Sequence, residues 1–64
     1  MSYGIATYAD AELFLLEALE ETDRNAAEYD LDQILTECYD VVWCWDIQQV
    51  EDDLFWDIVA NNTL

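Results

Sequence analysis

Hydrophobic residues recur at helical spacing in three stretches of this chain, separated by short polar segments. The first stretch follows the spacing i, i+3, i+4, i+7, i+8 and i+11 and comprises Ala11, Phe14, Leu15, Ala18, Leu19 and Thr22. A single stripe with this period predicts an amphipathic helix over about residues 8–22. Thr7 followed by Asp10 resembles a capping box in which Asp replaces Glu, and it marks the start of this helix.

The second and third stretches each follow acidic residues that suit a helix N-terminus. Asp30 is a residue type that caps helices, and the apolar repeat after it predicts a helix over about residues 31–41. Residues 51–53 are all acidic, and negative charge is favourable near the positive end of a helix dipole. The repeat that follows them predicts a third helix over about residues 52–61.

Residues 42–50 are the segment in which helix and strand patterns compete. Trp43 and Trp45 are aromatic and follow two valines, a composition that is common in strands, yet the helical repeat also runs into this segment. We expect either an extension of the second helix or an irregular connection with a short strand. The predicted fold class is mainly α, a small three-helix bundle formed by a single acidic helical domain over residues 1–64.

Composition then limits the chemistry that this bundle can perform. The chain has sixteen Asp and Glu, one Lys or Arg and no His, so its formal net charge is −15. It is also 55% hydrophobic and 14% aromatic, which is unlike a disordered acidic tail. With no His and Arg24 as the only cation, nucleophilic triads and phosphate-binding loops lack their residues. We expect no enzyme activity and no cofactor.

Two acidic clusters and two cysteines are the remaining candidates for metal or redox chemistry. Residues 30–32 and 51–53 suggest calcium ligands, but the loop pattern fails because Val41 and Asn62 stand where a closing Glu is required. Helix capping explains both clusters, and no metal site is predicted. Cys38 and Cys44 are expected to be buried apolar thiols, with a disulfide or a reactive thiol as the alternatives.

The amount and the distribution of negative charge exceed what solubility requires. A small domain needs a net charge of only about 2 to 8 for solubility. A compact chain of this length spans about 28 Å, and that length of duplex DNA carries roughly sixteen phosphates. We therefore expect a surface on which carboxylates replace phosphates. The candidate residues are Asp10, Glu17, Glu20, Glu21, Asp30, Asp32, Glu37, Asp40, Glu51, Asp52, Asp53 and Asp57.

Apolar surface remains after a three-helix core is assigned. Leu13 and Leu16 lie opposite the core stripe of the first helix, and Trp56 lies off the stripe of the third. The aromatic residues also exceed what three short helices can bury, and Trp is a favoured interface anchor. We expect these three residues to mediate self-association, and Trp56 to be exposed or to form a dimer contact.

In its small size, helical pattern and acidic residues spread from Asp10 to Asp57, the chain resembles the DNA-mimic anti-CRISPR and antirestriction proteins of phages and mobile elements. These proteins share no sequence motif, so the resemblance is one of overall character. It implies an inhibitor that occupies the DNA site of a basic bacterial defence complex, in the first place a type I CRISPR surveillance complex. It also implies no direct binding of nucleic acid.

Other functions are compatible with the same residues. An antirestriction mimic would act in the same way on a restriction enzyme. An acidic helical adaptor or antitoxin-like module would bind a basic protein through Leu13, Leu16 or Trp56, and a halophilic protein would be acidic for reasons unrelated to its task. Because no apolar run approaches the roughly 18 residues of a membrane span and no signal peptide is evident, we expect a soluble protein of the bacterial cytoplasm.

Overall fold

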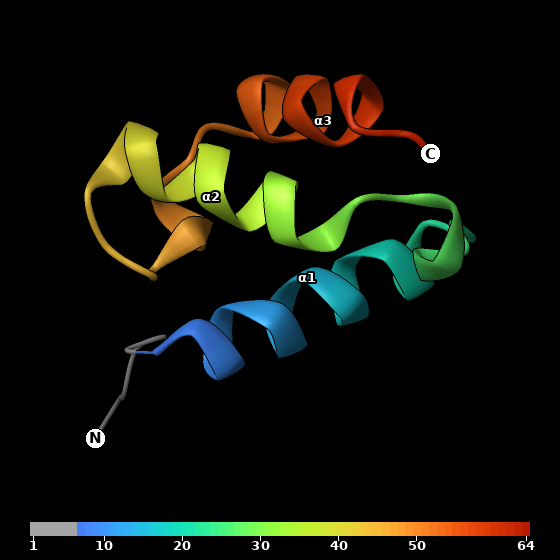
Figure 1. Cartoon of the computed structure of the whole chain (residues 1–64), viewed down its shortest axis with the longest axis horizontal. Coiled ribbons are helices and arrows are strands. Elements are labelled where there is room, and N and C mark those ends of the chain that lie inside the picture. The colour runs from blue at the N-terminus through green and yellow to red at the C-terminus, as the bar shows by residue number, and fades with distance from the viewer. Residues whose placement is uncertain (1–6) are drawn as a thin grey trace.

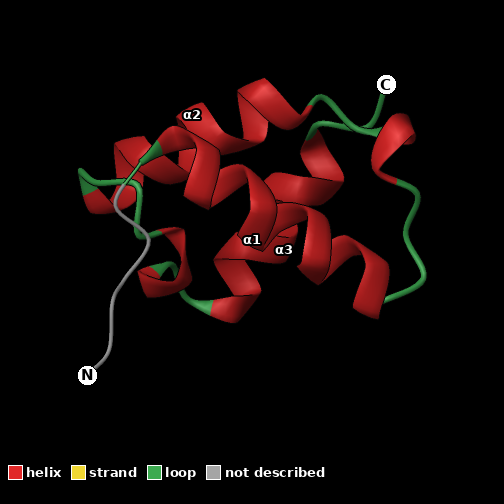
Figure 2. Cartoon of the chain, turned by 90° about the horizontal axis from the view of Figure 1, so that it is seen from below, coloured by secondary structure: helices red, strands yellow, loops and turns green. Residues whose placement is uncertain are grey.

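The computed structural model describes residues 7–64 of the chain, and this part forms a bundle of three α-helices. They are α1 (Tyr8–Glu21), α2 (Leu31–Val42) and α3 (Asp52–Asn61). Helix α2 contacts both α1 and α3 and lies between them in Figure 1. Two short 3₁₀ helices, η1 (Ala26–Glu28) and η2 (Ile47–Gln49), lie in the connections, which are the green segments of Figure 2. The predicted helical fold class is confirmed.

The ends of the three helices lie within one residue of the predicted positions, because capping residues fix two of their starts. The Thr7 hydroxyl accepts a hydrogen bond from the Asp10 N–H at 3.2 Å, and the Asp30 carboxylate accepts one from the Gln33 N–H at 3.3 Å. Such caps satisfy backbone donors that the helix leaves unpaired. Glu51, the residue before α3, makes no such bond, and Asp52 and Asp53 place negative charge in the first turn of that helix.

Residues 42–50 resolve into an irregular connection rather than a strand. Helix α2 extends by one residue to Val42, and Trp43 then turns into the left-handed region with φ of 60°. The Trp43 N–H donates to the Tyr39 carbonyl at 2.6 Å, which closes the last turn of the helix. The chain continues through η2, where the Val50 N–H donates to the Ile47 carbonyl at 3.1 Å.

Each helix contributes one apolar stripe to a single core. The buried residues are Ala11, Leu15 and Leu19 of α1, Ile34, Leu35 and Cys38 of α2, Phe55, Ile58 and Val59 of α3, and Ile47 and Val50 from the connection. Fully burying a side chain such as Leu15 stabilises a fold by about 1.5–3 kcal/mol. Ile47 and Val50 complete the core where three short helices leave it open.

The C-terminus is tied back to the segment before α2. Tyr29 and Thr63 form an isolated antiparallel bridge, and the Leu64 N–H donates to the Glu28 carbonyl at 2.8 Å. The Asn62 side chain also donates to the Glu37 carboxylate at 2.9 Å. These contacts fix the end of α3 against the start of α2, close to the point marked C in Figure 1.

The bundle is longer than a spherical chain of its length. Its radius of gyration is 10.9 Å, as the size rule predicts, but its principal extents are 34 × 21 × 19 Å rather than about 28 Å in every direction. Within the described residues, every helix is too short or too polar to cross a bilayer.

Candidate functional site

The acidic residues lie on the surface of the bundle. All sixteen fall within the described part of the chain, and none of them is buried. Glu12, Glu37 and Asp46 are half-buried, and the rest are exposed. Eleven of the twelve candidate phosphate-mimicking residues are therefore exposed, and Glu37 is the exception.

Helical geometry places many of these carboxylates on outward faces. An α-helix advances about 100° per residue, so Asp10, Glu17 and Glu21 share one face of α1, away from Leu15 and Leu19. Asp32 and Asp40 occupy the corresponding face of α2. Asp53 and Asp57, one turn apart, occupy that of α3. Each helix thus presents an acidic outer face opposite its core stripe, and we call these three faces the acidic faces.

Part of this set already has partners inside the fold. The Tyr8 hydroxyl donates to the Asp32 carboxylate at 2.7 Å, which raises the pKa of Tyr8 to about 12. The Glu37 carboxylate accepts from the Gln33 and Asn62 side chains at 3.3 and 2.9 Å. Asp30, as described above, caps α2. The hydrogen bond from Asn62 to Glu37 helps to hold the C-terminal residues in place, a role that sequence reasoning did not anticipate.

The predicted self-association residues do not form one patch. Leu13 is 59% exposed, but Leu16 and Trp56 are half-buried. Trp56 faces Phe14 and Ala18, and Phe14 lies about 100° around α1 from Leu13. Trp56 is half-buried rather than exposed, because the turn after α1 covers it: the Arg24 guanidinium carbon lies 4.5 Å from its ring centroid.

Among the aromatic residues of the described part of the chain, Trp43 is the most exposed. Its side chain is 77% exposed and its backbone is left-handed, a conformation that is unfavourable for a bulky residue. Its neighbour Trp45 is turned inward, with ring centroids 5.1 Å from Tyr8 and 4.6 Å from Tyr39. The sequence gives the same aromatic signal at both positions, and it is the turn at the end of α2 and the contacts of Trp45 with the two tyrosines that distinguish them.

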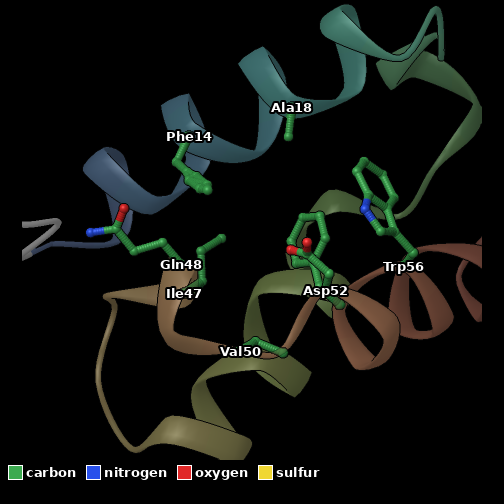
Figure 3. Close-up of a pocket in the computed structure, with 8 residues that line it drawn as sticks. Phe14, Ala18, Ile47, Gln48, Val50, Asp52 and Trp56 are labelled. Atoms are coloured by element: carbon green, nitrogen blue, oxygen red, sulfur yellow. The ribbon is translucent and has the colours of Figure 1, made fainter.

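A hollow of about 180 Å³ opens between α1, η2 and α3. Phe14 and Ala18 reach into it from α1, and Asp52 and Trp56 reach into it from α3, while the Gln48 amide is directed away (Figure 3). The remaining lining residues are Ile47, Val50 and Phe55. Sequence reasoning missed this hollow, because its walls come from three separate elements.

The cysteines differ in their surroundings, and both are free thiols. Cys38 is buried in the core, and burial raises the pKa of its thiol to about 11. Cys44 is half-buried in the connection after α2. The expectation of a buried apolar thiol is confirmed for Cys38 and only partly met by Cys44.

Among residues 7–64, no three Cys, Asp or Glu side chains gather in an arrangement that could hold a metal ion. The clusters at residues 30–32 and 51–53 instead occupy helix starts. Comparisons of the chain with protein-family models, with curated proteins and with solved structures found no match.

Proposed function

We propose that this chain is a DNA mimic that inhibits a bacterial defence complex by occupying its DNA-binding site, in the first place that of a type I CRISPR surveillance complex. One observation carries the proposal: the acidic faces expose carboxylates on all three helices of a rigid bundle. In a basic channel these carboxylates would engage the Lys and Arg side chains that otherwise bind phosphates.

The density of charge supports the same function. Sixteen carboxylates along the 34 Å axis give about one charge per 2.1 Å, against about one per 1.7 Å in duplex DNA. The only Lys or Arg in the chain, Arg24, adds little opposing charge. Because this charge is carried by helices, little conformational entropy is lost when a partner binds.

The mechanism is steric and electrostatic. A net charge of −15 steers a basic partner toward the chain over long distances and accelerates association. Dissolved salt screens such attraction, so binding weakens as ionic strength rises. Double-stranded DNA and this chain then compete for one channel, and neither is altered chemically.

Purified type I surveillance complexes provide the direct experiment. Their binding of target DNA is measured with and without this chain, at low and at moderate salt. We expect the chain to reduce DNA binding, and to do so less at the higher salt concentration. Unchanged DNA binding by the surveillance complexes, together with blocked restriction cleavage, would assign the mimicry to restriction enzymes.

A second candidate function is an acidic helical adaptor, which Trp43 favours. A Trp that is 77% exposed is an effective anchor for a protein partner, and Leu13 adds a second exposed apolar side chain. For an adaptor, Trp43→Ala or Leu13→Gln would abolish partner binding while removal of acidic charge would not. For a DNA mimic the reverse holds, and sedimentation of both variants also tests self-association.

A further inference from the structure

The hollow between α1, η2 and α3 has the dimensions of a site for one side chain. Its volume of about 180 Å³ is below the roughly 300 Å³ at which small-molecule sites begin. Its walls are mainly apolar, with Phe14 and Ala18 on α1 and Trp56 on α3 (Figure 3). Phe55 also lines the hollow. An occupant must therefore be slender and must bring apolar surface.

The polar part of the lining selects the charge of that occupant. Asp52 is exposed and is the only charged residue of the lining, and the chain as a whole has a net charge of −15. Aromatic faces attract cations, and the flat guanidinium group both stacks on such rings and bonds to a carboxylate. A site with aromatic walls and one carboxylate thus suits arginine better than a neutral side chain.

The fold contains one example of this contact. The Arg24 guanidinium carbon lies 4.5 Å from the centroid of the Trp56 ring, the same ring that lines the hollow. Arg24 is not among the residues that line the hollow, and it is the only Lys or Arg in the sequence. A second guanidinium must therefore come from another molecule.

We propose that the hollow receives one arginine side chain of the basic partner protein. The aliphatic part of that side chain lies along Phe14 and Ala18, and its guanidinium group lies between the Asp52 carboxylate and the π-face of a lining aromatic ring. The identity of the donor rests on the proposed function, in which the partner is rich in Arg and Lys. Attraction over the acidic faces is spread out and leaves the orientation of the partner open. Binding of one arginine in the hollow would fix that orientation.

The test is a nuclear magnetic resonance titration of the full chain with N-acetyl-arginine amide, and with N-acetyl-norvaline amide as the uncharged probe. We expect the arginine probe to shift the Trp56 indole and Ala18 amide resonances in a saturable way. Asp52→Asn should weaken this binding about threefold or more. Asp53→Asn is the matched control, because it removes the same charge from the same helical turn, at a residue that does not line the hollow.

Several outcomes would overturn the proposal. Shifts spread evenly over the acidic faces, or an equal effect of the two variants, would show diffuse attraction only. Equally tight binding of the norvaline probe would show a purely apolar site. Shifts of the Trp56 resonance that depend on the protein concentration, without any probe, would show that a second copy of the chain fills the hollow. No defence complex is present in this titration, so its failure is distinct from a failure of DNA mimicry.

Discussion

The guanidinium carbon of Arg24 lies 4.5 Å from the centroid of the Trp56 ring, so the only basic side chain of the sequence joins the turn after α1 to α3. This pair explains why Trp56 is half-buried although it lies off the apolar stripe of its helix. Trp56, but not Arg24, also lines the hollow.

Replacement of Arg24 should therefore weaken the fold by more than a surface substitution does. We expect Arg24→Gln to lower the free energy of unfolding by about 0.5–1 kcal/mol, the usual contribution of a cation–π contact at an exposed site. Arg24→Lys keeps the charge and should retain part of the contact. Urea denaturation of the three proteins measures the difference, and equal stability of all three would show that the contact contributes nothing.

Trp43 offers a substitution that should stabilise the chain. Its φ of 60° is unfavourable for any residue with a Cβ and natural for glycine at the end of a helix. We expect Trp43→Gly to raise the free energy of unfolding by about 0.5–1 kcal/mol, because the exposed ring contributes little packing. Trp43→Ala is the control, since alanine retains the backbone penalty. A glycine variant less stable than the alanine variant would contradict a left-handed backbone at this position, and loss of stability in both variants relative to the unmodified chain would mean that the ring packs on the fold.

Ionisation of Tyr8 should affect stability only at high pH. Its hydrogen bond to Asp32 raises the pKa from 10.0 to about 12, and the folded state therefore favours the protonated phenol. The resulting stabilisation is complete below pH 10 and is lost as the pH rises through about 12. Absorbance titration should show one tyrosine that ionises late, and Tyr8→Phe should remove it. A late tyrosine that persists in Tyr8→Phe would refute the assignment.

The two thiols should differ in their reactivity. Burial raises the pKa of Cys38 to about 11, so little thiolate forms near neutral pH and reagents cannot reach the sulfur. We expect iodoacetamide to modify the half-buried Cys44 first, and Cys38 only when the chain unfolds. Mass spectrometry of Cys38→Ala and Cys44→Ala distinguishes the sites. Rapid modification of Cys38 in the folded chain would show that the core opens locally.

Local patterns in the sequence were sufficient to predict the helices. Thr7 and Asp30 cap helices through contacts within a few residues, and such contacts can be inferred from spacing. The conformation of Trp43 could not be inferred in this way, because nothing in its type favours a left-handed backbone.

Less of the candidate site than of the fold could be predicted from the sequence. Exposure of the acidic residues followed from their position opposite the core stripes. The half-burial of Trp56 and the hollow beside it depend on how α1, η2 and α3 pack, which no single segment encodes. The hydrogen bonds of Glu37 to Gln33 and Asn62 likewise depend partly on where the C-terminus returns.

If charge on the acidic faces replaces DNA phosphates, its removal must restore DNA binding by the defence complex, and a competition assay with matched variants measures this effect. One variant combines Glu17→Gln, Glu21→Gln, Asp53→Asn and Asp57→Asn. In its control, each Glu of the four is replaced by Asp and each Asp by Glu, so that the charge is kept. We expect the neutral variant to remain folded, because it loses repulsive i,i+4 pairs. We also expect its inhibition of DNA binding to be at least about tenfold weaker than that of the unmodified chain. The exchanged control should inhibit like the unmodified chain. A folded neutral variant that inhibits normally would contradict the phosphate-replacement mechanism.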